Sequence, residues 1–170
     1  MWNNKTNIVL IGMPAVGKST VGILLAKKIG FDFLDTDIII QTSEGTTLSR
    51  IIDKTGVTEF LKTEEKYCLS INGTNKVIAT GGSVVYSRKA MAHLGKNGRI
   101  IYLETDLKPL KKRLSALDSR GVIRGPGQNI DSLYFERVPL YRQFADITIA
   151  CNGLTPDQVL TKISRNLTIA

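Results

Sequence analysis

The segment from residue 12 to residue 19 has the residue types and spacing of a phosphate-binding loop. It reads GMPAVGKS and matches the pattern G-x-x-x-x-G-K-[ST]. Glycines let the backbone wrap closely around an anion, and the helix that follows presents its positive end to it. In such a loop Lys18 reaches the β- and γ-phosphates of a nucleotide, and Ser19 ligates Mg²⁺. The motif therefore predicts that a solvent-facing loop binds ATP with Mg²⁺.

The expected nucleotide contacts run from this loop into the first turn of the next helix. Seven residues are expected to contact the nucleotide: Gly12, Ala15, Val16, Gly17, Lys18, Ser19 and Thr20. The loop follows an apolar run at 7–11, which predicts a buried strand, and opens an amphipathic run at 18–29, which predicts a helix. A phosphate-binding loop requires this strand–loop–helix context, so the surrounding sequence supports the motif.

Two carboxylates, Asp35 and Asp37, come at the end of a second strand, which is predicted at 31–35. Residues two apart in an extended chain point to the same side, and the carboxyl ends of parallel strands line the ligand crevice of an open α/β sheet. One carboxylate there can join the Mg²⁺ shell, and the other can accept the proton of an acceptor hydroxyl. The alternative is that Asp37 is a helix cap, because it precedes an apolar helical run.

Glycines and arginines further along the chain offer groups for a second ligand. A strand predicted at 77–80 is followed by Gly81, Gly82 and Ser83, where backbone can approach a ligand closely. The glycine-rich segment 118–130 is predicted to be a loop, and its Arg120 and Arg124 can close over a transferring phosphate. On a helix predicted at 131–144, Arg137 can bind a carboxylate through two parallel hydrogen bonds.

Short apolar runs alternate with longer amphipathic runs along the whole chain. Strands are predicted at 7–11, 31–35, 77–80, 99–103 and 147–150. Helices are predicted at 18–29, 37–42, 48–54, 57–71, 87–94, 106–117, 131–144 and 155–167. Pro139 is expected to kink or break its helix. This alternation predicts a single α/β domain over residues 1–170, with a parallel sheet covered by helices on both faces.

Composition bounds the class of protein and its surroundings. Hydrophobic residues make up 42% of the chain and charged residues 22%, with a net charge of +8. The Lys and Arg residues are scattered, so we expect an anionic small-molecule partner and no nucleic acid. No apolar run reaches the length of a membrane span, and the N-terminus lacks the features of a signal peptide, so no membrane is expected. Two isolated cysteines, Cys68 and Cys151, fit buried positions in a cytoplasmic protein.

Four motifs taken together resemble those of the shikimate kinase family. They are the phosphate-binding loop, LDTD at 34–37, ATGG at 79–82 and ERVPLY at 136–141, in the family's order. The resemblance implies a P-loop kinase fold, three-layer α/β/α with a five-stranded parallel sheet, a mobile lid around 118–130, and a monomer. It also implies ATP-dependent phosphorylation of a ring hydroxyl on a small carboxylic acid, which for shikimate is the 3-hydroxyl.

The resemblance also assigns roles to particular residues. Asp35 belongs to the Mg²⁺ shell, and Asp37 accepts the proton of the acceptor hydroxyl. Arg137 holds the acceptor carboxylate, while a lid arginine, either Arg120 or Arg124, contacts the transferring phosphate. The glycine segment that begins at residue 81 contacts the acceptor.

Three departures from the family pattern fall on the acceptor side or in the lid. Leu61 stands where the family has an arginine that clamps the acceptor carboxylate, and Ser83 stands where it has a third glycine. The lid lacks the usual Arg-Pro-Leu-Leu run. One interpretation is a shikimate kinase with a rearranged clamp. A second is a related kinase for another small hydroxylated acid, sugar acid or polyol.

A third interpretation is a nucleotide-binding module that has lost turnover and serves regulation or nucleic-acid binding. The retained Lys18, Ser19, Asp35 and Asp37 argue against it, because a module without turnover has no need of a proton acceptor.

Overall fold

Five parallel strands form one sheet in the computed structural model, which describes residues 6–116 and 128–167. The strands are β1 (Asn7–Ile11), β2 (Asp32–Asp35), β3 (Lys76–Ala79), β4 (Gly98–Glu104) and β5 (Ile147–Ala150). Their order in the sheet is β2-β3-β1-β4-β5, and every neighbouring pair is parallel. The predicted parallel sheet is confirmed.

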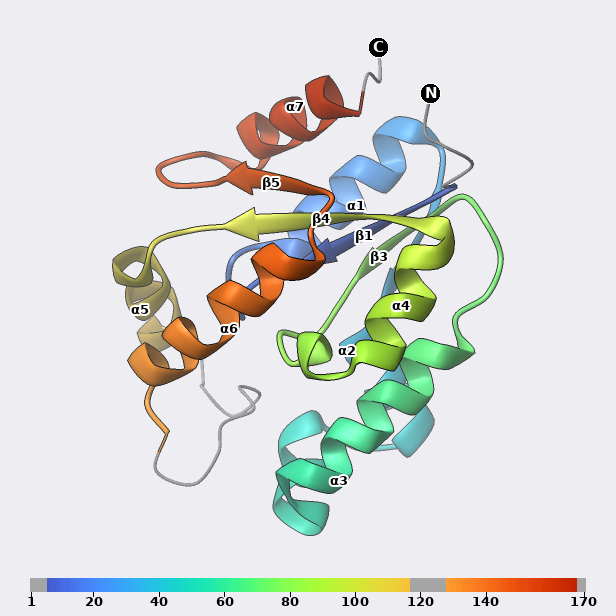
Figure 1. Ribbon diagram of the computed structural model, residues 1–170, viewed down its shortest axis with the longest axis vertical. Helices are drawn as coiled ribbons and strands as arrows, with labels where there is room; N and C mark the ends of the chain where they lie inside the picture. The colour runs from blue at the N-terminus through green and yellow to red at the C-terminus, as the bar shows by residue number, and fades with distance from the viewer. Residues whose placement is uncertain (1–5, 117–127, 168–170) are drawn as a thin grey trace.

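Helices cover both faces of this sheet (Figure 1). They are α1 (Lys18–Ile29), α2 (Thr36–Glu44), α3 (Leu48–Ser70), α4 (Arg88–Asn97), α5 (Leu107–Ala116), α6 (Ile130–Phe144) and α7 (Pro156–Asn166), with a 3₁₀ turn η1 (Val84–Tyr86). Helices α1 and α7 pack together on one face, and α4 and α6 pack on the other, with α3 against α4. The three-layer α/β/α architecture is therefore confirmed.

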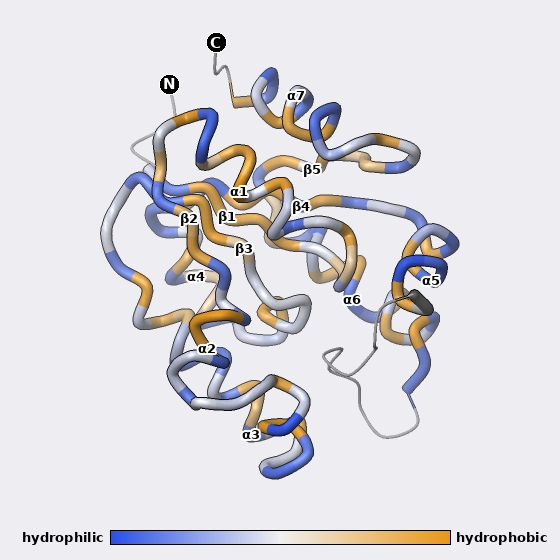
Figure 2. Tube along the Cα trace, turned by 180° about the vertical axis from the view of Figure 1, so that it is seen from behind, coloured by the Kyte–Doolittle hydropathy of each residue, from blue (hydrophilic) through white to orange (hydrophobic). Residues whose placement is uncertain are grey.

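The central strands β1, β3 and β4 are largely apolar because they are buried on both faces. All five residues of β1 are buried, and β4 is buried along most of its length. Figure 2 shows the hydrophobic colour concentrated in these central strands, while the outer helices alternate between hydrophobic and hydrophilic residues. The main core lies between the sheet and the helices, and a smaller cluster of Ile40, Leu48, Ile51 and Phe60 lies between α2 and α3.

Local sequence signals explain where several helices begin and end. Helix α1 has the predicted bounds, and Gly30 ends it in a left-handed conformation with φ of 71°. Helix α7 begins at Pro156, and the side chain of Thr155 caps it by accepting a hydrogen bond from the backbone N–H of Gln158. Such caps satisfy backbone groups that the helix itself leaves unpaired.

Two helical segments had an interruption predicted from the sequence. The helices predicted at 48–54 and 57–71 lie end to end in α3, and the predicted break between them is confirmed at Gly56, whose φ of 81° and ψ of 165° are not helical. At Pro139, where a kink or a break was expected, α6 does not break but runs through the proline. A proline leaves the carbonyl four residues earlier without its helical partner. That residue is Phe135, which is 69% exposed, so water can reach this part of the helix.

Among the described helices, none combines the length and the apolar character that crossing a membrane requires.

Candidate active site

The loop between β1 and α1 turns through residues with positive φ. Gly12, Ala15 and Gly17 have φ values of 144°, 64° and 109°. A Cβ atom on Gly12 would lie 2.7 Å from the carbonyl oxygen of Leu103 on β4. Both the backbone conformation and the close approach of the neighbouring strand therefore require glycine at this position. The loop lies tightly against the carboxyl end of the sheet as a result.

Lys18 begins α1, and its ammonium group is turned into the loop. Its Nζ donates hydrogen bonds to the carbonyl oxygens of Gly12, at 2.8 Å, and Met13, at 2.9 Å. The side chain is buried, so the expectation of a solvent-facing charge is wrong: the loop wraps around this side chain. Burial lowers the pKa of Lys18 to about 8, and the negative charge of Asp37 opposes that shift. At neutral pH the lysine still carries its positive charge.

Asp35 connects the phosphate-binding loop to the start of α2. Its Oδ2 accepts a 2.6 Å hydrogen bond from the Ser19 hydroxyl. Its Oδ1 accepts from the backbone N–H groups of Asp37 and Ile38, at 3.0 Å and 3.3 Å, and so caps the helix. The helix cap is therefore Asp35, and not Asp37 as the alternative interpretation had it. Ser19 and Asp35 thus place two oxygen atoms of the kind that hard cations prefer next to each other beside the loop.

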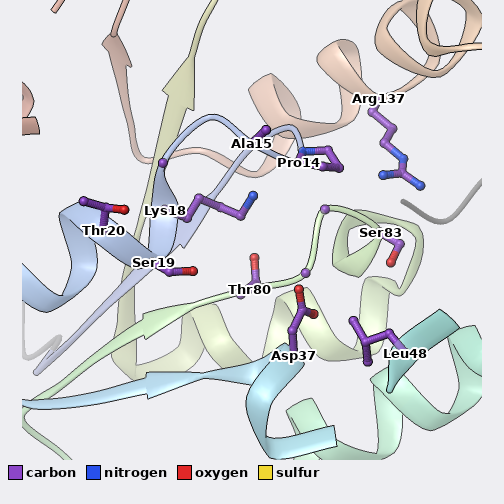
Figure 3. Close-up of a pocket in the computed structure, with 13 residues that line it drawn as sticks. Pro14, Ala15, Lys18, Ser19, Thr20, Asp37, Leu48, Thr80, Ser83 and Arg137 are labelled. Carbon is purple, nitrogen blue, oxygen red and sulfur yellow. The ribbon is translucent and has the colours of Figure 1, made fainter. Parts of the chain in front are cut away.

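Asp37 lies in the first turn of α2 and points into the cavity between the loop and α3 (Figure 3). Burial raises the pKa of this carboxyl to about 6, and the nearby charge of Asp35 adds to that shift while Lys18 opposes it. The carboxylate is thus ionised at neutral pH and has a raised affinity for a proton. Of the two aspartates, one caps a helix and the other faces the cavity.

The segment after β3 is held in place by hydrogen bonds to three other elements. The N–H of Gly81 donates to the Thr36 hydroxyl at 2.9 Å, and the Tyr141 hydroxyl donates to the carbonyl of Gly82 at 2.6 Å. The Thr80 hydroxyl donates to the carbonyl of Leu10 at 3.0 Å. The glycine segment is therefore fixed between β1, α2 and α6 at the carboxyl end of the sheet.

Glu64 on α3 is buried directly behind this glycine segment. Its Oε2 accepts a 2.7 Å hydrogen bond from the Ser83 hydroxyl, while its Oε1 has no hydrogen-bond partner. A Cβ on Gly81 would lie 2.2 Å from Oε1, so a larger residue there would displace the Glu64 carboxyl. Burial raises the pKa of Glu64 to about 7, the Ser83 hydrogen bond opposes the shift, and Asp37 adds to it, while Arg137 and Lys18 lower it.

A cavity of about 360 Å³ joins these parts into one site (Figure 3). Ten of the residues singled out from the sequence line it: Ala15, Gly17, Lys18, Ser19, Thr20, Asp37, Gly81, Gly82, Ser83 and Arg137. Three others do not line it. Gly12 accepts a hydrogen bond from Lys18, Asp35 accepts one from Ser19, and Val16 is buried in the core. Arg120 and Arg124, with most of the predicted lid, lie outside the described residues.

Several residues of this site were missed by the sequence analysis. Pro14, Leu48 and Thr80 also line the cavity. Glu64 approaches it from behind, and Arg113 on α5 donates from Nη1 to the carbonyls of residues 15 and 16 at 3.3 Å each. The sequence did contain a signal for Glu64. This residue lies three positions after Leu61, where the chain departs from the family pattern. Nothing in the local sequence marks Arg113.

The fold and the site together define a protein of the P-loop kinase class, with the phosphate-binding loop after β1 and the ligand cavity at the carboxyl ends of the strands. A family model described as shikimate kinase matches residues 14–168. The chain belongs to the shikimate kinase family, and the resemblance drawn from the sequence is confirmed.

Individual relatives agree with this assignment. The chain is 40% identical over 160 residues to a shikimate kinase of Thermodesulfovibrio yellowstonii, with 92% of each chain covered. It is 34% identical over 162 residues to one of Francisella tularensis subsp. novicida, covering 93% of this chain and 92% of the relative. Among solved structures, shikimate kinase from Acinetobacter baumannii in complex with shikimate matches with a TM-score of 0.85 at 28% identity, covering 96% and 93%. The protein is therefore a phosphotransferase that acts on a hydroxyl group.

The buried carboxyl of Glu64 predicts a measurable effect of pH on stability. Its pKa rises from its ordinary 4.5 to about 7 on folding, so the folded protein retains a proton that the unfolded chain releases. Stability from this group is present below pH 4.5 and is lost as pH rises through about 7. Glu64→Gln, which keeps an acceptor for Ser83, should raise the free energy of unfolding at pH 8 by about 1–3 kcal/mol and flatten its dependence between pH 5 and 8.

Urea unfolding of both proteins at pH 5 and at pH 8 measures this difference. Glu65→Gln makes the same change of charge at the next position of α3 and retains Glu64, so it should keep the wild-type dependence. An unaltered pH slope in Glu64→Gln would contradict the assignment.

Proposed function

We propose that this protein catalyses the ATP-dependent phosphorylation of shikimate at its 3-hydroxyl. One observation carries the proposal: a single cavity is lined both by Lys18 and Ser19 of the phosphate-binding loop and by Asp37 and Arg137. The first pair suits a phosphate donor, and the second suits an acceptor that carries both a hydroxyl and a carboxylate. The relatives named as shikimate kinases, one of them solved with shikimate, support this acceptor.

The nucleotide end is built for a triphosphate with Mg²⁺. Backbone N–H groups of the loop and the N-terminus of α1 attract the phosphates, and Lys18 exchanges its bonds to the carbonyls of Gly12 and Met13 for bonds to the β- and γ-phosphates. Ser19 and Asp35 offer the hard oxygen ligands that Mg²⁺ prefers. Among the described residues no group of three or more His, Cys, Asp or Glu forms a metal cage, which fits an ion held largely by phosphates and water. When bound, Mg²⁺ neutralises charge on the phosphates.

The acceptor end performs the proton transfer. Asp37 accepts the proton of the 3-hydroxyl as that oxygen attacks the γ-phosphorus; the new O–P bond forms while the bond from the γ-phosphorus to the ADP oxygen breaks. The pKa of about 6 places Asp37 in its ionised form at neutral pH, ready to take that proton. Arg137, which is 1% exposed, holds the acceptor carboxylate so that the hydroxyl faces Asp37.

The surroundings of the protein follow from its surface and thiols. Both cysteines, Cys68 and Cys151, are free and buried, as expected from the sequence. We propose that the protein is cytoplasmic, because free thiols persist in a reducing compartment. We also propose that it is a monomer and acts on small molecules without nucleic acid or membrane.

Lys18→Ala tests the phosphate-binding loop. Turnover should fall by roughly 10²–10³-fold, because the ammonium group of Lys18 stabilises the negative charge that develops on the phosphate in the transition state. Coupled detection of ADP release with shikimate measures the rate. Lys27→Ala changes the same residue type at an exposed position of α1 and should retain wild-type turnover. Wild-type rates in Lys18→Ala would refute the nucleotide site.

Asp37→Asn tests the division of roles between the two aspartates. Turnover should fall by about 10²–10⁴-fold with ATP affinity unchanged, because asparagine cannot accept the proton. Asp35→Asn still caps α2 and should instead shift the Mg²⁺ concentration needed for half-maximal rate. Steady-state kinetics across Mg²⁺ concentrations distinguish the two. Equal loss of ATP binding in both variants, with no other effect, would show that the roles are assigned wrongly.

Leu61→Arg tests the acceptor. Residue 61 lies three positions before Glu64 on α3, so an arginine there can pair with the unpartnered Oε1 and add positive charge near the acceptor. The Michaelis constant for shikimate should fall roughly ten-fold, with ATP kinetics unchanged.

The same assay run over hydroxylated acids, sugar acids and polyols provides the comparison. Negligible shikimate turnover in both wild type and Leu61→Arg, with turnover of another compound in the wild type, would exclude shikimate and favour the related kinase for another acceptor.

A further inference from the structure

On one side, the guanidinium of Arg137 contacts Tyr86, a residue that has no role in the proposed function. The Nε–H of Arg137 donates a 3.1 Å hydrogen bond to the Tyr86 hydroxyl oxygen. The guanidinium carbon also lies 5.1 Å from the centre of the tyrosine ring. Tyr86 ends the turn η1, which follows the glycine segment, whereas Arg137 lies 51 residues later on α6. The contact therefore joins two separate elements of the acceptor end.

The tyrosine hydroxyl is itself oriented by a third residue. It donates its hydrogen to Oε1 of Glu136, which leaves its lone pairs to accept from Arg137. Oε2 of Glu136 accepts a 2.6 Å hydrogen bond from Gln128. Burial, and then the hydrogen bond to Glu136, raise the pKa of Tyr86, so the hydroxyl keeps its proton at neutral pH. Donor and acceptor roles along this chain of groups are thus determined.

The opposite end of the guanidinium lies at the cavity wall. A Cβ on Gly82 would come within 3.1 Å of Nη1 of Arg137, and both residues line the cavity. Nε is turned toward Tyr86, and the terminal nitrogen is turned toward the space where the acceptor would lie. Figure 3 shows this side chain reaching from α6 toward the glycine segment.

Charge in the cavity makes this orientation important. Of the described residues that line it, Lys18 and Arg137 are the two with positive charge. If Lys18 serves the phosphates, an acceptor carboxylate depends on Arg137, and a misdirected guanidinium would lose the geometry of two parallel bonds. Leu61, which lines an adjacent cavity of about 130 Å³ with Tyr86, offers no charge.

We propose that Tyr86 is a positioning residue for acceptor specificity: by holding Nε of Arg137, it presents the terminal nitrogens of the guanidinium end-on to the carboxylate of the acceptor. This inference rests on the proposed function. The hydroxyl, and not the ring alone, carries the effect, because it occupies the Nε donor that would otherwise be available for a side-on pair.

Tyr86→Phe is the direct test, since it keeps the ring and removes the hydroxyl. The Michaelis constant for shikimate should rise about ten-fold, with kcat and the Michaelis constant for ATP changed less than two-fold. With the analogue in which CH₂OH replaces the carboxylate, Tyr86→Phe and wild type should differ less than two-fold. Tyr67→Phe is the matched control, because its hydroxyl also donates to a glutamate, Glu44, at 2.7 Å on the surface. It should leave both Michaelis constants unchanged.

A second variant shows whether Tyr86 acts through Arg137. Lysine cannot reproduce the Nε donor together with the fork, so in an Arg137→Lys background Tyr86→Phe should have no further effect on the Michaelis constant for shikimate. Additive effects, an equal rise for the alcohol analogue, or an unchanged constant in Tyr86→Phe would each overturn the inference. If the wild-type protein does not turn over shikimate, the proposed function and this inference are both overturned. If it does turn over shikimate but the Tyr86 variants do not behave as expected, this inference alone is overturned.

Discussion

The parallel pairing of β2, β3 and β1 is the constraint on which the site depends. In register, Leu10 lies beside Ala79, and Ala79 lies beside Asp35. Because the three strands run in the same direction, their carboxyl ends meet at one edge, and the segments that follow them converge there. The phosphate-binding loop, the aspartate pair and the glycine segment are separated in sequence but share this edge. An antiparallel neighbour would have carried one of them to the far end of the sheet.

Convergence at one edge brings like and unlike charges into a poorly solvated space. Burial raises the pKa values of Asp37 and Glu64 and lowers that of Lys18. The positive charge of Lys18 partly offsets the shifts of the two carboxyls, and their negative charges partly offset the shift of Lys18. Hydroxyl groups from Thr36 and Ser83 supply the hydrogen bonds that the glycine segment and Glu64 need. The glycine segment and Glu64 are therefore held largely by hydrogen bonds from neutral donors.

Family membership and chain-specific residues bear on different parts of the chemistry. The loop residues Lys18 and Ser19 and the carboxylate Asp37 line a shared cavity, and the proposed function assigns them to phosphoryl transfer. Leu61, which the family resemblance places where other members have an arginine, lines an adjacent cavity together with Tyr86. If the proposed function holds, this enzyme should differ from its relatives in how the acceptor carboxylate is held, and less in how ATP is bound.

The sequence by itself determined the features that are contiguous along the chain. The phosphate-binding loop has a local pattern, and strand and helix periodicity gave the parallel sheet and the bounds of α1, so both could be predicted. Whether the predicted helix would break at Pro139 could not be predicted, since the exposure of the orphaned carbonyl depends on packing. Nor could the pairing of Glu64 with Ser83 or of Tyr86 with Arg137, which join residues 19 and 51 positions apart. Only the tertiary structure decided these contacts and the shifted pKa values, because desolvation and charge proximity depend on which distant side chains the fold encloses together.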